Sequence, residues 1–239
     1  MANRWVIPDI HGCAKTLKSL LDFHVKPTKH DMLYFLGDYI DRGPDSKGVI
    51  DIIRKLQDDE YNVRLLKGNH EDYLIKAYAA ESERKSFLGI KSKNRMKEEW
   101  KKYGGKETLE SFGVKDLKDI PIEYIDWLAK LELFIELDDF VLVHAGLNFN
   151  NDDPFEDEHA ILWLRDFKPQ PEKINMRTLI HGHVPINLEL IHHLKGGNSY
   201  KYIDLDNGIY MSDRSGFGNL VALELNSMEV VAQNNVDMG

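Results

Sequence analysis

The sequence predicts an α/β protein in which a parallel sheet is covered by helices. Three short apolar runs, 4–8, 31–36 and 62–66, have the length and side chains of buried strands, and a helical pattern follows each of them. This alternation is typical of parallel strands, because a parallel connection needs a crossover helix. Each run also ends in polar side chains, and the strand ends of an open α/β sheet are where ligands bind.

The first two expected helices are amphipathic. After the first strand, one face of the helix carries Leu17, Leu20, Leu21 and Phe23. The second helix, 46–56, begins at Ser46, a suitable N-cap, and its apolar stripe consists of Val49, Ile50, Ile53 and Leu56. We expect both helices to pack these faces against the sheet.

The middle of the chain, about 72–130, has few β-branched runs and no strand alternation, so we expect a mostly helical insertion. Within it, 84–106 carries nine Lys and Arg residues against two acids, Glu98 and Glu99. Such a run is either a solvated helical face or a positively charged surface that steers an anionic substrate. Gly104-Gly105-Lys106 lacks the spacing of a Walker motif and is expected to separate two helices.

The final third is rich in predicted strands. The segments 133–137 and 140–144 are expected to form a hairpin that turns at Asp138-Asp139, and 178–183 is a further apolar run. Segments 202–205, 208–212 and 220–225 are expected to complete an antiparallel set. The tail after Asn226 carries a short apolar stretch, 230–232, and is expected to fray. We expect residues 1–239 to form a single domain.

Composition narrows the class of protein. The 239 residues are 42% hydrophobic and 30% charged, as in ordinary globular proteins, and the formal charge of −9 argues against a general nucleic-acid binder. The single cysteine, Cys13, excludes an internal disulfide and suits a reducing compartment. Because no signal-peptide core and no run of about 20 apolar residues is present, we expect a cytoplasmic protein without membrane partners.

Charged side chains follow the second strand at unusual density. Asp38, Asp41 and Arg42 lie within six residues of a buried strand, where unpartnered charges would each cost several kcal/mol. A divalent metal would satisfy the aspartates and an anion would satisfy Arg42. The neighbouring strands end in similar clusters, Asp9 with His11 and Asn69 with His70.

The polar residues at predicted strand ends form a mixed oxygen and nitrogen ligand set. Its members are Asp9, His11, Asp38, Asn69, His144 and His183. Carboxylate, amide and imidazole ligands suit Mn, Fe or Zn better than Ca. Two metals about 3.5–4 Å apart need a spanning ligand. Asp38, on the middle of the three strands, is the candidate for that role.

These motifs resemble the calcineurin-like metallophosphoesterases, and most of all the serine/threonine phosphoprotein phosphatase branch. The resemblance rests on Asp9-Ile10-His11-Gly12, Gly37-Asp38-Tyr39-Ile40-Asp41-Arg42-Gly43, Gly68-Asn69-His70-Glu71, His144-Ala145-Gly146 and Gly182-His183-Val184-Pro185, in that order. It implies a four-layer α/β/β/α sandwich with a helical insertion. The family usually has glycine where this chain has Pro8, which implies altered geometry at that strand end.

The resemblance implies a role for each motif residue. Asp9, His11 and Asp38 would hold one divalent ion, and a second ion would be held by Asp38, Asn69, His144 and His183. A hydroxide bridging the metals, most readily Mn, would attack phosphorus directly. Other branches of the superfamily use two histidines spaced like His181 and His183, but this branch implies only His183.

The remaining implied roles concern the phosphate and the leaving group. Arg42 and Arg165, the latter in Trp163-Leu164-Arg165, would bind the phosphoryl oxygens. His70 would protonate the leaving alkoxide, with Asp41 holding it in orientation and keeping it cationic.

The implied substrate is a phosphoserine or phosphothreonine protein, or a small phosphoester. Hydrolysis of dinucleoside polyphosphates is the alternative, because symmetrical diadenosine tetraphosphatases share every motif named above. A catalytically idle binding protein on the same fold is disfavoured, since such a protein needs no His70–Asp41 pair. A nucleic-acid phosphodiesterase fits the acidic charge balance poorly.

Overall fold

The computed structural model describes residues 2–83, 86–87, 90–91, 93–196 and 201–238. Its first sheet has the strand order β11-β10-β1-β2-β3. The parallel strands β1 (Arg4–Ile7), β2 (Met32–Phe35) and β3 (Asn62–Leu65) are the three predicted from the apolar runs. On the other side of β1, β10 (Asn219–Glu224) and β11 (Glu229–Asn234) are antiparallel.

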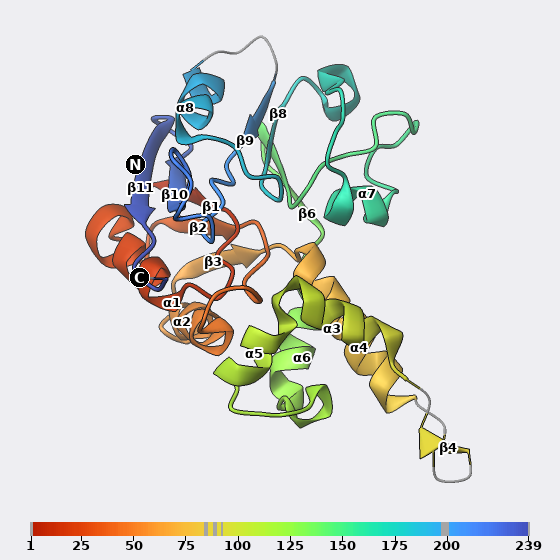
Figure 1. Ribbon diagram of the computed structural model, residues 1–239. Coiled ribbons are helices and arrows are strands. Elements are labelled where there is room, and N and C mark those ends of the chain that lie inside the picture. The colour runs from red at the N-terminus through yellow and green to blue at the C-terminus, as the bar shows by residue number, and fades with distance from the viewer. Residues whose placement is uncertain (1, 84–85, 88–89, 92, 197–200, 239) are drawn as a thin grey trace.

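The second sheet has the order β6-β7-β8-β9 (Figure 1). The expected hairpin forms from β6 (Phe134–Glu136) and β7 (Phe140–Val143). The expected antiparallel set is wrong in part. β8 (Thr178–His181) and β9 (Tyr202–Asp204) run parallel to β7 and to each other, and 208–212 is a turn. The crossover between β8 and β9 is α8 (Leu188–Gly196), which permits the parallel pairing.

The two sheets face each other, and helices cover their outer sides. Side chains alternate along β1: Trp5 and Ile7 point to the helical side, whereas Val6 points to the second sheet. The apolar layer between the sheets includes Val6, Tyr34, Leu142, Ile180, Val221 and Leu223. On the far side, Ile161 of α7 (Glu158–Trp163) packs on Val141 and Leu179. The predicted four-layer α/β/β/α sandwich is therefore confirmed.

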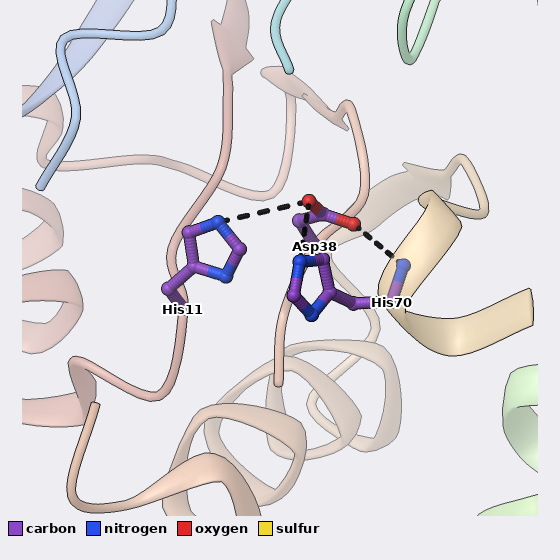
Figure 2. A group of neighbouring side chains, drawn as sticks. All are labelled: His11, Asp38 and His70. Carbon is purple, nitrogen blue, oxygen red and sulfur yellow. Dashed lines mark hydrogen bonds and ion pairs between the residues drawn. The ribbon is translucent and has the colours of Figure 1, made fainter. Parts of the chain in front are cut away.

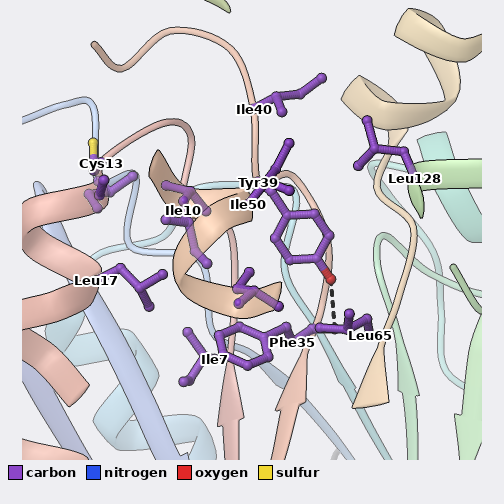
Figure 3. Packing of buried hydrophobic residues seen from close by; sticks show 14 of the residues in the cluster. Ile7, Ile10, Cys13, Leu17, Phe35, Tyr39, Ile40, Ile50, Leu65 and Leu128 are labelled. Atoms are coloured by element: carbon purple, nitrogen blue, oxygen red, sulfur yellow. Dashed lines mark hydrogen bonds between the residues drawn. The ribbon is translucent and has the colours of Figure 1, made fainter. Parts of the chain in front are cut away.

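The core under α1 (Ala14–Ser19) and α2 (Ser46–Asp58) is formed by the predicted apolar faces (Figure 3). Leu17 and Ile50 are fully buried against Ile7 and Phe35, each contributing roughly 1.5–3 kcal/mol of hydrophobic stabilisation. Tyr39 is also fully buried, and its hydroxyl donates to the carbonyl of Leu66 at 2.7 Å. The core thus extends directly beneath the charged segment 38–42.

Two local expectations are corrected. Phe23 is 68% exposed, because 20–25 is a π-helical turn, in which residues three apart no longer share a face. The N-cap of α2 is Asp45, which accepts from the backbone of Gly48, and not Ser46. The Ser46 hydroxyl instead accepts from the backbone N–H of Asp41 at 3.0 Å.

The middle of the chain is helical as expected, with one exception. Its helices are α3 (Asn69–Ser82), α4 (Arg95–Trp100), α5 (Lys106–Ser111) and α6 (Ile122–Ala129). A small hairpin of β4 (Ser86–Phe87) and β5 (Ile90–Lys91) projects from their far end (Figure 1). Strands of two residues are too short to show alternation, so the sequence did not reveal them. The single-domain organisation, with an insertion at 72–130, stays a prediction.

No helix in the described ranges is both long and apolar enough to cross a membrane. The cytoplasmic location expected from the sequence stays a prediction.

The C-terminal tail does not fray as expected. After β11, the carboxylate of Asp237 accepts from the backbone N–H groups of Lys15 and Thr16, at 3.0 and 2.8 Å, and from the Thr16 hydroxyl at 2.6 Å. Cys13, the N-cap of α1, has no side-chain capping bond of its own. Asp237 therefore caps α1 from more than two hundred residues away.

We expect Asp237→Ala to lower the free energy of unfolding by about 1–2 kcal/mol, because the first turn of α1 loses its capping acceptor. Urea unfolding followed by circular dichroism measures the change. Asp213→Ala, at an exposed position, is the matched control. Equal midpoints for the two variants would show that the tail does not stabilise α1.

Candidate active site

The structure brings the polar strand ends together around Asp38. Two groups of side chains have ligand atoms within 4.8 Å of one another: His11, Asp38 and His70, and Asp38, His144 and His183. Figure 2 shows His11 and His70 beside the Asp38 carboxylate. Asp38 belongs to both groups, which is the position that a bridging ligand needs.

The two oxygens of Asp38 face different partners. Its Oδ2 lies 3.6 Å from His11 Nε2, and its Oδ1 lies 3.5 Å from His144 Nε2. Burial by itself would raise the pKa of Asp38, but the surrounding imidazoles, His144 and His70 foremost, outweigh burial and lower that pKa. The carboxylate is thus ionised and ready to bind a cation.

The second group suits a cation because its acceptors face one another. His144 donates from Nδ1 to the carbonyl of Leu36 at 2.9 Å, which leaves a lone pair on Nε2. That lone pair faces Asn69 Oδ1 at 2.9 Å and Asp38 Oδ1 at 3.5 Å. With Nδ1 as the donor and the ring neutral, Nε2 and the two oxygens are all acceptors, and a divalent metal ion would satisfy all three.

Asp9 lies beside the first group. It is buried, its Oδ2 is 3.9 Å from His11 Nε2, and its oxygens accept from the backbone N–H of His183 at 3.1 and 3.2 Å. Burial, followed by the charges of Asp206 and Asp38, raises the pKa of Asp9 well above its usual value. An added cation would relieve this accumulation of negative charge. Pro8 lies beyond the last paired residue of β1 and removes no ladder bond.

His11 and His70 differ in protonation although both adjoin Asp38. Burial, and then the charge of Arg42, lowers the pKa of His11 well below its usual value. Burial also acts to lower the pKa of His70, but the carboxylates of Asp38 and Asp41 outweigh it and raise that pKa. Because metal ligands must be unprotonated, His11 suits a ligand and His70 suits a proton donor.

His70 is held by Asp41, the partner that the sequence suggested. Its Nδ1 lies 2.7 Å from Asp41 Oδ2. Asp41 is fully buried and accepts two further bonds, from Trp100 Nε1 at 3.0 Å and from the Thr108 hydroxyl at 2.6 Å. Sequence reasoning missed Trp100 and Thr108, because in a basic helical segment they resemble ordinary packing residues.

Arg42 lies across the mouth of the first group. Its guanidinium contacts His11 Nε2 at 2.7 Å and His70 Nε2 at 3.1 Å, and it stacks 4.2 Å from the ring centre of Tyr210. Arg165 is exposed just after α7, and its charge helps to lower the pKa of His183 to about 3, after burial and His144. Among the described residues Arg165 forms no ion pair, so the structure brings it near His183 but does not join it to Arg42.

The turn after β2 is strained and is held by Glu71, a motif residue for which sequence reasoning missed a role. Asp38, Asp41 and Arg42 have φ of 52°, 71° and 69°, values that residues other than glycine rarely adopt. Glu71 accepts from the backbone N–H groups of Asp38 and Tyr39, at 2.8 and 2.9 Å. At Gly68, any Cβ would lie 2.1 Å from Asp38 Oδ1, so only glycine allows this approach.

Other buried polar residues lie around the site. His181 is outside both groups: its Nδ1 is 3.1 Å from the carbonyl of Gly182, its ring stacks on Tyr202, and its Nε2 has no partner among the described residues. Asp206 was missed. It is buried, burial raises its pKa to about 7, and its charge acts on Asp9. The only sequence signal for a role of Asp206 is its position just after the apolar strand β9.

The sequence was compared with curated proteins. The chain is 34% identical over 148 residues to a symmetrical bis(5'-nucleosyl)-tetraphosphatase of Wigglesworthia glossinidia brevipalpis, covering 61% of this chain and 45% of the relative. It is 30% identical over 144 residues to the enzyme of that name from Vibrio parahaemolyticus, covering 60% of this chain and 44% of the relative. The matched region thus spans less than half the length of these relatives.

The fold and the motif set were compared with known structures and families. A protein serine/threonine phosphatase from Saccharomyces cerevisiae superposes with a TM-score of 0.65, covering 100% of this chain and 81% of that one at 17% identity, a likeness of fold alone. The family model for calcineurin-like phosphoesterases matches residues 3–212, which include every motif described above. The chain therefore belongs to the calcineurin-like phosphoesterase family.

Proposed function

We propose that the protein is a metal-dependent phosphoric ester hydrolase that cleaves dinucleoside polyphosphates. The observation that carries the hydrolase proposal is the position of Asp38 between two groups of ligand atoms, with a buried His70–Asp41 pair beside them. The family uses two divalent metal ions, and the converging acceptors at His144, Asn69 and Asp38 fit such an ion.

Each ion would be held by part of the predicted ligand set. Asp9, His11 and Asp38 would hold one, and Asp38, Asn69, His144 and His183 the other, with Mn, Fe or Zn suited to these ligands. When bound, the ions would supply Lewis-acid polarisation of the phosphoester and would activate water for attack. The lowered pKa values of His11, His144 and His183 keep these imidazoles neutral, as ligands must be.

The arginines would bind the phosphoryl group. Arg42 contacts both His11 and His70, so its guanidinium lies between the proposed ligand and the proposed acid. A phosphoryl oxygen that displaces these contacts would receive charge-assisted hydrogen bonds that strengthen as negative charge grows. Arg165, which is exposed, acts on His183 by its charge and has no ion pair in the described chain, would bind the same phosphoryl group.

His70 would donate a proton to the leaving oxygen. Its Nδ1 is engaged by Asp41, so Nε2 is the nitrogen that would carry the transferred proton once a substrate displaces the Arg42 guanidinium, which donates to Nε2 at 3.1 Å. Asp41 keeps the ring in place because Trp100 and Thr108 fix the carboxylate from the insertion. An idle binding protein would have no use for this acid.

The substrate class rests on the relatives. The sequence relatives are symmetrical bis(5'-nucleosyl)-tetraphosphatases, whereas the phosphoprotein phosphatase is similar in fold alone. The phosphoprotein substrate favoured from the motifs is therefore less well supported than its alternative. The motifs themselves do not separate the two, because both classes need the same phosphoryl chemistry.

Asp38→Asn should abolish metal binding and turnover together, because no neutral amide replaces a bridging carboxylate. We expect wild-type protein to bind two equivalents of Mn²⁺, and the variant to lose at least about 100-fold in turnover of an aryl phosphate. Metal content by mass spectrometry and initial rates measure both effects. Asp213→Asn is the exposed control, and two bound metals with a normal rate in Asp38→Asn would remove the bridging role.

His70→Asn should slow hydrolysis of alkyl phosphates by about 10²–10⁴-fold and that of aryl phosphates much less, because aryloxide leaves without protonation. Initial rates on one alkyl and one aryl ester measure the difference. His192→Asn, at an exposed position of α8, is the control. Equal losses on both esters would contradict the general-acid role of His70.

Metal-loaded protein should show a kcat/KM at least about tenfold higher for diadenosine tetraphosphate than for a phosphothreonine peptide. Chromatography of the products tests the mode of cleavage, and two molecules of ADP are expected from symmetrical hydrolysis. A preference for the peptide would favour the hypothesis that the substrate is a phosphoprotein. A lack of hydrolysis of both substrates would contradict the proposed function.

A further inference from the structure

A cleft of about 650 Å³ opens beside Arg42, between the insertion and the C-terminal part of the chain. We call it the lysine cleft, and define it by Lys101, Lys102, Tyr103, Lys106, Glu107 and Tyr210, with Arg42 at its inner end. This volume is in the range of small-molecule sites. We propose that the lysine cleft binds the departing nucleoside diphosphate, an assignment that rests on the proposed function.

The charge of the lysine cleft suits a polyphosphate. Lys101, Lys102 and Lys106 form no ion pair with any described residue, whereas nearby Lys97 is paired with Asp116 at 2.8 Å. Three unpaired ammonium groups beside one guanidinium are unusual in a chain with a formal charge of −9. Such a concentration attracts a highly anionic ligand, and phosphate groups provide the charge-assisted acceptors that lysines lack here.

Glu107 points to a ligand that also donates hydrogen bonds. Its Oε2 is buried and has no partner in the described part of the chain. Glu107 also lines the lysine cleft, and a carboxylate in a site for anions is out of place unless the ligand offers donors as well as phosphates. Ribose hydroxyls and base amino groups are such donors, and inorganic polyphosphate at neutral pH offers hardly any.

Aromatic side chains supply a surface for a base. Tyr103 is 54% exposed, and its ring is supported edge-on by Tyr73, whose ring centre is 5.9 Å away. Tyr73 in turn contacts Trp163 of α7 at 5.9 Å. A supported, exposed ring at the rim of a cationic cleft is suited to stacking with a nucleobase.

The lysine cleft shares Arg42 with the proposed general acid. Arg42 lines the cleft and contacts His70 Nε2 at 3.1 Å, so the proposed acid and the cleft share this guanidinium. The group that receives a proton from His70 must lie next to it. The departing half of the substrate, rather than the half attached to the attacked phosphorus, therefore extends into the lysine cleft.

The backbone fixes the cleft relative to Arg42. The carbonyl of Gly104 accepts from the backbone N–H of Arg42 at 3.3 Å. Gly104 has a φ of +110°, and a Cβ there would lie 2.3 Å from Arg42 N, so only glycine lets the two segments approach so closely. Lys101–Gly105 and the phosphoryl-binding arginine thus form one unit.

Calorimetric titration of metal-loaded protein with ADP and with pyrophosphate tests the assignment. The triple variant Lys101→Ala/Lys102→Ala/Lys106→Ala should bind ADP about tenfold or more weakly. Its matched control, Lys29→Ala/Lys118→Ala/Lys130→Ala, removes the same charge from exposed positions and should bind like wild type. Equal ADP affinity in the two triple variants would overturn the proposal.

Two single variants separate a nucleoside site from a merely cationic surface. Tyr103→Ala should weaken ADP about five- to tenfold and leave pyrophosphate binding unaltered. Glu107→Leu should weaken ADP but tighten pyrophosphate, because it removes both an acceptor and a repelling charge. If Glu107→Leu tightens both ligands, the lysine cleft attracts anions by charge alone and the proposal is wrong.

Turnover separates this proposal from the proposed function. The ratio of kcat/KM for diadenosine tetraphosphate to that for an aryl phosphate should fall about tenfold in the cleft triple variant, because the aryl ester has no second phosphate chain. Normal hydrolysis of diadenosine tetraphosphate by that variant would overturn the subsite and leave the proposed function standing. If the wild type binds ADP in the lysine cleft but does not cleave diadenosine tetraphosphate, the proposed function is wrong and the lysine cleft remains a nucleotide site.

Discussion

One buried carboxylate, that of Asp41, joins the parts of the candidate site. The carboxylate accepts hydrogen bonds from His70 at the start of α3 and from Trp100 and Thr108 in the insertion. The backbone N–H of Asp41 donates to the Ser46 hydroxyl at the start of α2. A carboxylate with no exposed surface is costly to bury unless it has such partners. Because the partners come from different elements, the proton donor, the phosphoryl-binding turn and the insertion are positioned together.

The turn after β2, which contains Asp41, is strained. Asp38, Asp41 and Arg42 all adopt positive φ, at a cost of about 1–3 kcal/mol each. Glu71 offsets part of this cost by accepting backbone N–H groups of Asp38 and Tyr39, and the buried Tyr39 ring anchors the turn in the core. The strain is therefore maintained by Glu71 outside the turn and by the buried Tyr39 ring within it, so the functional side chains converge before a substrate arrives.

Neighbouring imidazoles are given different properties by their surroundings. His11 is buried beside Arg42, and burial, followed by the charge of Arg42, lowers its pKa. His70 lies against Asp41, and its pKa rises. This difference divides the roles of ligand and acid without a difference in residue type. Substrate preference, in contrast, does not follow from these shared groups and depends on the surfaces around Arg42, such as the lysine cleft.

The sequence by itself determined the strand–helix alternation and the candidate residues at the strand ends, because strand periodicity and motif spacing are local properties, whereas the four-layer class followed from the resemblance of the motifs to a known family. Only the tertiary structure showed that His70 joins the first ligand group, that Trp100 and Thr108 hold Asp41, that Asp237 caps α1, and that three lysines open a cleft beside Arg42. These contacts join residues 59, 67 and 221 positions apart. No local pattern encodes such pairs, since they depend on how the insertion and the C-terminal tail pack on the sheets.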